Sequence, residues 1–143
     1  MQKKSEAGQK AFEYHKSGFH CAEAVLKAIV EIYGNGSSRD IPKIATGFGG
    51  GIGRTKQEIC GAITGGVMAI GFLSGRSEPG ADWADASEMA AKLKRRFVHE
   101  HGTTNCGALL ATFGPQENMM RCKQLSGEVA GMLADILDKK GNG

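Results

Sequence analysis

Few aromatic residues and little excess charge limit the partners expected for this chain. Aromatic residues make up 6% of the 143 residues, and the formal net charge is +3. Proteins that bind nucleic acids usually combine a broad basic surface with aromatic side chains on which bases stack. The only dense basic run, residues 92–96, is better explained as the solvated face of a helix. We therefore expect no nucleic-acid binding.

The chain also lacks a hydrophobic run long enough to cross a membrane. A membrane-spanning helix needs about 20 apolar residues, and the nearly uncharged stretch of residues 59–73 is shorter than that. The N-terminal sequence Met-Gln-Lys-Lys-Ser-Glu contains no apolar segment of the kind found in secretion signals. These features predict a cytoplasmic protein without membrane contact. In that reducing compartment, disulfides are rarely structural.

The four cysteines, Cys21, Cys60, Cys106 and Cys122, are all isolated in the sequence. No two of them are separated by two residues, which excludes the local clips of zinc ribbons, thioredoxin-like sites and c-type haem attachment. Any shared site must therefore be assembled by the fold. A chain of this length buries enough core to fold without disulfides. Redox activity or metal binding is then the favoured role of these cysteines.

Three of these cysteines stand where a helix is predicted to begin. Cys21 and Cys60 each open an apolar stretch, and Cys106 follows Asn105, a favoured N-cap residue. Free backbone N–H groups at a helix start stabilise an anion, so a thiol there ionises more easily. The thiolate is both the nucleophile and the metal ligand. Cys122 lies near the start of the last predicted helix. The alternative for each is an unreactive, packed side chain, a common role for free cysteine.

Apolar residues recur at three- and four-residue spacing along most of the chain, which predicts helices. The predicted helices cover residues 5–16, 21–33, 41–45, 59–73, 82–101, 105–111 and 119–137. Gly34 and Gly36 are expected to end the second helix, and Ser37 and Ser38 to precede the third. No segment alternates between apolar and polar residues as a half-buried strand would. We therefore predict an all-α fold, a single-domain helical bundle of about five to seven helices over residues 1–143.

The helix predicted at residues 59–73 is rich in glycine. Each glycine in a helix costs about 1 kcal/mol relative to alanine, so their accumulation suggests a compensating benefit. Gly61, Gly65 and Ala69 form a row of small residues that lets a neighbouring helix approach closely. We predict that this is the central helix and that the close approach brings the other cysteines near Cys60. The alternative is close packing with no site.

The glycine-rich segment at residues 47–53 matches neither common nucleotide-binding motif. The fingerprint Gly-x-Gly-x-x-Gly fails at every starting glycine, no Gly-Lys-Ser/Thr follows, and no predicted strand precedes the segment. Its backbone N–H groups could still bind an anion, with Arg54 adding positive charge. The candidate ligand-binding residues are Gly49, Gly50, Gly51, Gly53 and Arg54. The alternative is a loop that only turns a tight corner between helices.

An ordered set of motifs runs along most of the chain: Cys21-Ala-x-Ala-Val, Gly47-Phe-Gly-Gly-Gly-x-Gly-Arg54, Cys60-Gly-Ala-x-x-Gly65, Asn105-Cys106 and Cys122. This set resembles the C-GCAxxG-C-C family of redox-active proteins. The resemblance implies a small all-helical protein whose four cysteines take part in redox chemistry or metal binding. Family members often have asparagine before the first cysteine, where this sequence has His20. Whether His20 joins the site is left open.

The favoured hypothesis is a redox or electron-transfer module in which Cys21, Cys60, Cys106 and Cys122 converge. They would act either as two dithiol/disulfide pairs or as four thiolates around zinc or an iron–sulfur cluster, and four thiolates suit both of these. In the dithiol version, Cys60 is the predicted attacking thiolate, with Arg54 nearby for charge. The absence of Cys-x-x-Cys-His predicts no attached haem.

Two further hypotheses belong to other classes. One is a small-molecule or anion-binding module built on the glycine-rich segment and Arg54. The other is a structural, oligomeric protein with inert thiols. The expected partners are accordingly a redox protein or a second copy of the chain.

Overall fold

The computed structural model describes residues 2–35 and 39–142. In these ranges the chain forms seven α-helices and one short 3₁₀ helix: α1 (Gln2–Ser17), α2 (Cys21–Tyr33), α3 (Ile41–Ala45), η1 (Thr46–Phe48), α4 (Gly61–Ser74), α5 (Ala84–His101), α6 (Cys106–Phe113) and α7 (Met120–Asn142). The same ranges contain no named strand, only an isolated bridge between Ile59 and Asn105. The predicted all-α fold is therefore confirmed. Gly36, Ser37 and Ser38, which the sequence assigned to helix ends, lie outside the described residues.

The helix bounds agree closely with those predicted. α2 and α3 begin and end at the predicted residues. α4 begins at Gly61, two residues later than predicted, because Ile59 is paired with Asn105 and Cys60 is the N-cap. α7 continues past the predicted end to Asn142.

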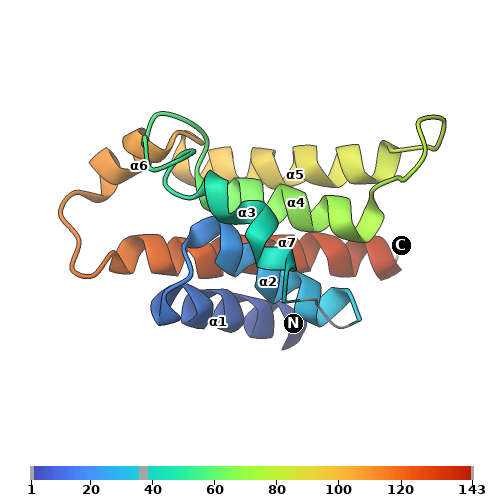
Figure 1. Cartoon of the computed structure of the whole chain (residues 1–143), viewed down its shortest axis with the longest axis horizontal. Helices are drawn as coiled ribbons and strands as arrows, with labels where there is room; N and C mark the ends of the chain where they lie inside the picture. The colour runs from blue at the N-terminus through green and yellow to red at the C-terminus, as the bar shows by residue number, and fades with distance from the viewer. Residues whose placement is uncertain (1, 36–38, 143) are drawn as a thin grey trace.

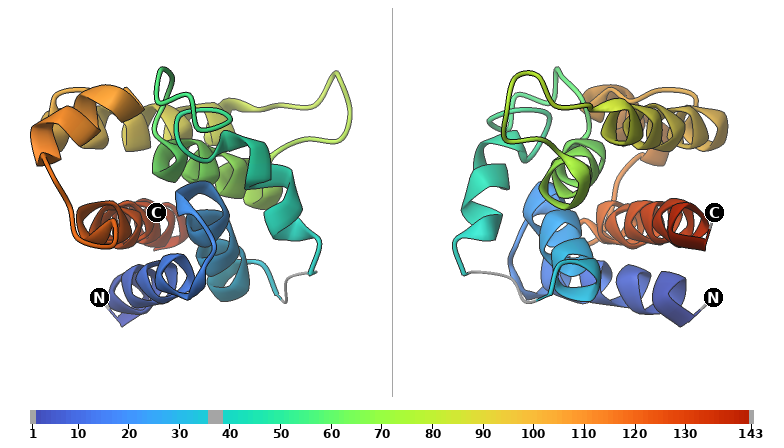
Figure 2. Two further views of the ribbon diagram at one scale, coloured as in Figure 1. Left: turned by 60° about the vertical axis from the view of Figure 1, so that its left-hand side comes forward. Right: turned by 90° about the vertical axis from the view of Figure 1, so that its right-hand side faces the viewer.

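The helices pack in two layers with α2 between them. α1 lies along α7, and α4 and α5 lie together on the opposite side of α2 (Figures 1 and 2). α3 packs on α2. α7 starts at the left-hand end of the molecule in Figure 1, near α6, and α2 and α4 start on the same side and run to the right. Several helix N-termini from distant parts of the sequence are thus brought to one end of the bundle.

Apolar faces of α2, α5 and α7 form much of the core. The largest fully buried side chains include Leu26 and Ile29 of α2, Leu93 and Phe97 of α5, and Leu133 of α7. Their three- and four-residue spacing places them on one face of each helix, as the sequence pattern predicted. Among the described residues, every helix is too short or too polar to be a candidate for crossing a bilayer.

α2 and α4 cross with their backbones in direct contact. A Cβ atom added at Gly65 would overlap the carbonyl of Ala22, and one added at Gly61 would overlap Cys21 Sγ. The predicted close approach at these small residues is confirmed, because nothing larger than a hydrogen atom fits between the two helices there. The crossing places the sulfur of Cys21 against the residue that follows Cys60.

Candidate functional site

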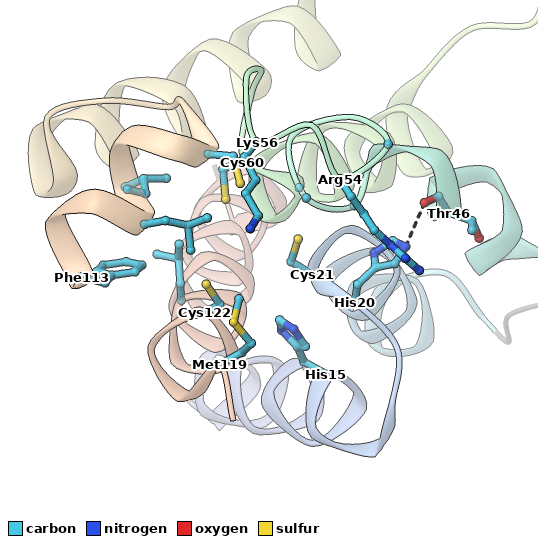
Figure 3. Close-up of a pocket in the computed structure, with 18 of the residues that line it drawn as sticks. His15, His20, Cys21, Thr46, Arg54, Lys56, Cys60, Phe113, Met119 and Cys122 are labelled. Atoms are coloured by element: carbon cyan, nitrogen blue, oxygen red, sulfur yellow. Dashed lines mark hydrogen bonds between the residues drawn. The ribbon is translucent and has the colours of Figure 1, made fainter. Parts of the chain in front are cut away.

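All four cysteines line one pocket at the end of the bundle where α2, α4 and α7 begin. The pocket has a volume of about 790 Å³. Its walls come from α1, the start of α2, the glycine-rich loop, the start of α4, α6 and the start of α7 (Figure 3). No local sequence motif could bring these segments together. The prediction that the fold must assemble any shared site therefore agrees with where the four cysteines lie.

The four thiols do not form a metal-binding set in this arrangement. Among the described residues, no three Cys, His, Asp or Glu side chains are placed to hold one metal ion. All four cysteines are free. A structural zinc site would need four ligands at about 2.3 Å from the metal in tetrahedral geometry. The residues as placed do not fit that group, and the four-thiolate site stays a prediction.

Burial makes Cys60 difficult to ionise. The residue is 6% exposed, and burial, followed by the neighbouring charge of Cys21, raises the pKa of its thiol to about 12. Backbone N–H groups at the start of α4 act in the opposite direction but are outweighed. The helix-start effect predicted from the sequence is therefore present but smaller than desolvation. This burial argues against Cys60 as the attacking thiolate.

Burial also makes Cys21, at the start of α2, difficult to ionise. Burial raises the pKa of its thiol, although the backbone N–H groups of Gly50 and Ala22 favour the thiolate. The negative charges of Cys122 and Cys106 oppose ionisation further. The expectation that helix starts make these thiols easy to ionise is wrong for all three helix-start cysteines, Cys21, Cys60 and Cys106, because burial raises the pKa of each and the sequence does not report how deeply each sulfur is buried.

Cys106 differs because a cation acts on its thiol. Burial and then the negative charge of Cys122 raise the pKa of Cys106 above its ordinary value, and Lys56 reduces this rise without reversing it. Lys56 extends from the glycine-rich loop with its ammonium group directed into the pocket (Figure 3). Cys106 is partly exposed, unlike Cys60. It is therefore the cysteine that combines access with a nearby positive charge.

Cys122 is held in place by a side chain from the segment that joins α6 to α7. The amide of Gln116 donates a hydrogen bond from Nε2 to Cys122 Sγ at 3.4 Å. Its Oε1 accepts a hydrogen bond from the backbone N–H of Cys122 at 3.0 Å. Two bonds from one amide thus fix both the main chain and the sulfur of Cys122.

The starts of α4 and α6 are joined by a short antiparallel ladder. The N–H of Cys60 donates to the carbonyl of Thr104 at 2.7 Å, and the N–H of Cys106 donates to the carbonyl of Glu58 at 2.8 Å. Asn105, between these two bonds, caps α6 by accepting a hydrogen bond from the N–H of Ala108 at 2.9 Å, as its residue type predicted. The ladder fixes Cys60 and Cys106 on the same side of the pocket.

The glycine-rich loop is a left-handed turn. Five consecutive residues have positive φ between 61° and 67°: Gly50, Gly51, Ile52, Gly53 and Arg54. This conformation is easy for glycine but disfavoured for a β-branched residue such as Ile52. Hydrogen bonds from Gly53 N–H to Gly47 O at 2.9 Å and from Lys56 N–H to Gly50 O at 2.8 Å close the turn. The second bond anchors the main chain of Lys56 beside the pocket.

Most of the predicted ligand-binding residues lie on the walls of the same pocket: Gly49, Gly50, Gly53 and Arg54. Gly51 does not line it, and its backbone packs closely on Cys106, because a Cβ added there would lie 2.7 Å from the Cβ of Cys106. His20 does line it, with Nε2 2.9 Å from the carbonyl oxygen of Thr46 and 3.2 Å from Glu23 (Figure 3). These contacts hold the His20 ring on the Thr46 side of the pocket.

His15 of α1 also lines the pocket. Its Nδ1 is hydrogen-bonded to Oγ of the fully buried Ser126 at 2.9 Å. Burial, reinforced by the positive charges of Lys123 and His20, lowers the pKa of His15 to about 4. The ring is therefore neutral at pH 7 and adds no charge to the pocket.

The depressed pKa of His15 makes the folded state sensitive to acid. Between pH 6.5 and about 4, the unfolded chain binds a proton at His15 and the folded chain does not. The free energy of unfolding must therefore decrease as the pH is lowered through this range, by about 2 kcal/mol after allowing for partial exposure of the ring. His15→Gln should flatten this part of the profile, measured by urea unfolding from pH 7 to pH 4. An unchanged slope in the variant would contradict the assignment.

The sequence analysis did not identify Lys56, Gln116 or His15 as site residues. Lys56 comes soon after the glycine-rich segment in the sequence, and this proximity could have suggested a role in the site. Gln116 bonds to Cys122 only six residues further on, but the contact crosses the irregular turn before α7 and follows no helical spacing. His15 carries no local signal, because its partner Ser126 lies 111 residues away in α7. Only the packing of the helices identifies them.

Comparisons with known proteins cover most of the chain. A family model described as "Putative redox-active protein (C_GCAxxG_C_C)" matches residues 19–136, which include all four cysteines and the glycine-rich loop. An uncharacterized protein of Archaeoglobus fulgidus is 26% identical over 117 residues, covering 76% of this chain and 77% of that protein. No solved structure matches the chain.

Proposed function

The chain belongs to the C_GCAxxG_C_C family, described as "Putative redox-active protein", and from this premise we propose that its pocket is a thiol–disulfide redox site. The observation that carries the proposal is that four cysteines from four separate segments all line the same pocket. Four cysteines with unrelated structural roles would have no reason to line the same pocket. In a reducing cytoplasm the resting form would be the thiol form.

The four thiols divide into two kinds in this proposal. Cys60 and Cys21 are the thiols whose ionisation burial opposes most directly, so they react slowly. Cys106 and Cys122 are partly exposed, as the Cys21 residue also is, but only for Cys106 does a cation, Lys56, oppose the rise in pKa that burial causes. We assign Cys106 as the attacking thiolate and Cys122 as the thiol that completes the disulfide.

Gln116 has a positioning role in this scheme. Its hydrogen bonds to the N–H and sulfur of Cys122 hold that side chain ready to attack a mixed disulfide on Cys106. A disulfide requires a sulfur–sulfur distance near 2.05 Å, and both cysteines are free in this structure. Oxidation would therefore draw the start of α6 toward the first turn of α7. The irregular segment 114–119, which joins the end of α6 to α7, would have to adjust.

The test is a thiol count on protein purified without oxygen. We expect four free thiols in the reduced protein, loss of two on titration with a small disulfide, and recovery of both with a dithiol reductant. Iron, zinc and acid-labile sulfide would be measured on the same sample, together with the visible absorption spectrum.

Two results would overturn the proposal. Four thiols that react only after unfolding would make the protein a structural one with inert cysteines. Visible absorption bands with stoichiometric iron and sulfide would instead identify a cluster held by the cysteines.

A further inference from the structure

We propose that the redox site takes a small organic disulfide that carries carboxylate groups, bound through Lys56 and Arg54. This inference rests on the proposed thiol–disulfide function and adds the class of substrate. It is drawn from the charge, the shape and the lining of the pocket.

The charges around the pocket are of one sign. Lys56 and Arg54 both line it, and no aspartate or glutamate does. None of the ion pairs among the described residues involves either cation. Glu23 contacts His20 at 3.2 Å and accepts a hydrogen bond from the hydroxyl of Thr46 at 2.7 Å, so it is engaged outside the lining. The pocket is therefore prepared for an anion.

The two cations lie at different places along the pocket. Lys56 reaches toward the thiols, whereas Arg54 extends toward His20 and Thr46 (Figure 3). A carboxylate at Lys56 would bring one half of the molecule beside the thiols, and a second carboxylate would extend toward Arg54. A disulfide with an acid on each half has this distribution of charge.

The remaining lining suits the uncharged part of such a molecule. Leu109, Leu110 and Phe113 of α6 and Leu125 of α7 supply an apolar wall. The volume of about 790 Å³ lies within the range of sites for small molecules. Apolar walls exclude water from the reacting sulfurs, which strengthens the attraction between Lys56 and a carboxylate.

The reaction balances with the disulfide as oxidant. The Cys106 thiolate attacks one sulfur of the substrate, forming a mixed disulfide and releasing one substrate half as a thiolate. The Cys122 thiolate then attacks Cys106 Sγ, forming the Cys106–Cys122 disulfide and releasing the second half. Two electrons pass from the protein to the substrate, and the two protons lost by the protein go to the released thiolates.

The test compares three disulfides of similar size: dithiodiglycolate, which is anionic, bis-hydroxyethyl disulfide, which is neutral, and cystamine, which is cationic. Loss of protein thiols is followed without oxygen, and each rate is divided by the rate for the same protein unfolded in urea. This ratio cancels the intrinsic reactivity of each disulfide. We expect dithiodiglycolate to exceed the neutral compound by about tenfold, which corresponds to about 1.4 kcal/mol, and cystamine to be slowest.

Variants that remove one positive charge test whether Lys56 and Arg54 cause the preference for the anionic disulfide. Lys56→Gln should abolish most of the preference for dithiodiglycolate over the neutral disulfide, and Arg54→Gln should reduce it. The ratio is informative even though Lys56→Gln also weakens the Cys106 thiolate, because that effect acts on all three compounds. Lys92→Gln, an exposed change on α5 away from the pocket, should leave the ratio unchanged.

The outcomes distinguish the inference from the proposed function. Equal normalised rates for the three disulfides, or a ratio that Lys56→Gln does not change, would overturn the substrate class and leave thiol–disulfide exchange standing. Failure of all three compounds to oxidise the folded protein would overturn the proposed function itself.

Discussion

Cys106→Ser is expected to slow oxidation of the protein by small disulfides at least about a hundredfold, whereas Cys60→Ser should change the rate by less than about threefold. The thiolate is the reacting form, and its population falls tenfold for each unit by which the pKa exceeds the pH. A thiol with a pKa of about 12, such as that of Cys60, is almost entirely protonated at neutral pH. The rate of thiol loss, followed with each variant under the same conditions, gives the comparison.

A third variant in the same experiment examines the second step. Cys122→Ser should accumulate a stable mixed disulfide between Cys106 and one half of the oxidant, visible in the mass of the intact protein. A loss of activity in Cys60→Ser as large as that in Cys106→Ser would restore the assignment expected from the sequence. It would show that Cys60 becomes accessible during the reaction.

Gly65→Ala should lower the free energy of unfolding by about 2 kcal/mol or more. Its new Cβ would overlap the carbonyl of Ala22, and the Cα of Ala22 would lie only 2.9 Å away. Backbone atoms cannot rotate aside, so α2 and α4 would have to separate. Overpacking of this kind typically costs about 1–3 kcal/mol and occasionally more, which exceeds the gain of about 1 kcal/mol in helix propensity.

Gly71→Ala in the same helix is the matched control. A Cβ at this exposed position would meet no atom within 4 Å. The better helix propensity of alanine should then raise the free energy of unfolding by about 0.5–1 kcal/mol. Urea unfolding of both variants decides the matter. Equal effects would mean that the contact at Gly65 does not limit the approach of the two helices.

The sequence predicted the fold well because its signals are local. Apolar spacing, the N-cap residue Asn105 and the breakers between segments set the helices to within a few residues. The small residues Gly61 and Gly65 also indicated a close helix contact. Which helix lies against them could not be predicted, since the partner backbone at Ala22 is defined only by the assembled bundle.

The candidate site was predictable in part of its membership but not in its chemistry. The isolated cysteines and the glycine-rich loop were identified from their sequence context, and they line one pocket. The relative reactivity of the thiols was not, because helix starts look alike in the sequence while desolvation differs between Cys60 and Cys106. Burial is a property of the whole fold, and a local pattern does not report it.

The buried thiol of Cys60 can also be used to measure opening motions of the protein. Its thiol is shielded by the ladder to Thr104 and by the crossing of α2 over α4, and it is 6% exposed. An alkylating reagent can reach it only during an opening event, so its labelling rate measures the free energy of that event, as amide exchange does. Cys106, nearer the surface, would be labelled without such an opening. The ratio of the two labelling rates, followed with increasing urea, would distinguish local opening of the pocket from unfolding of the whole bundle.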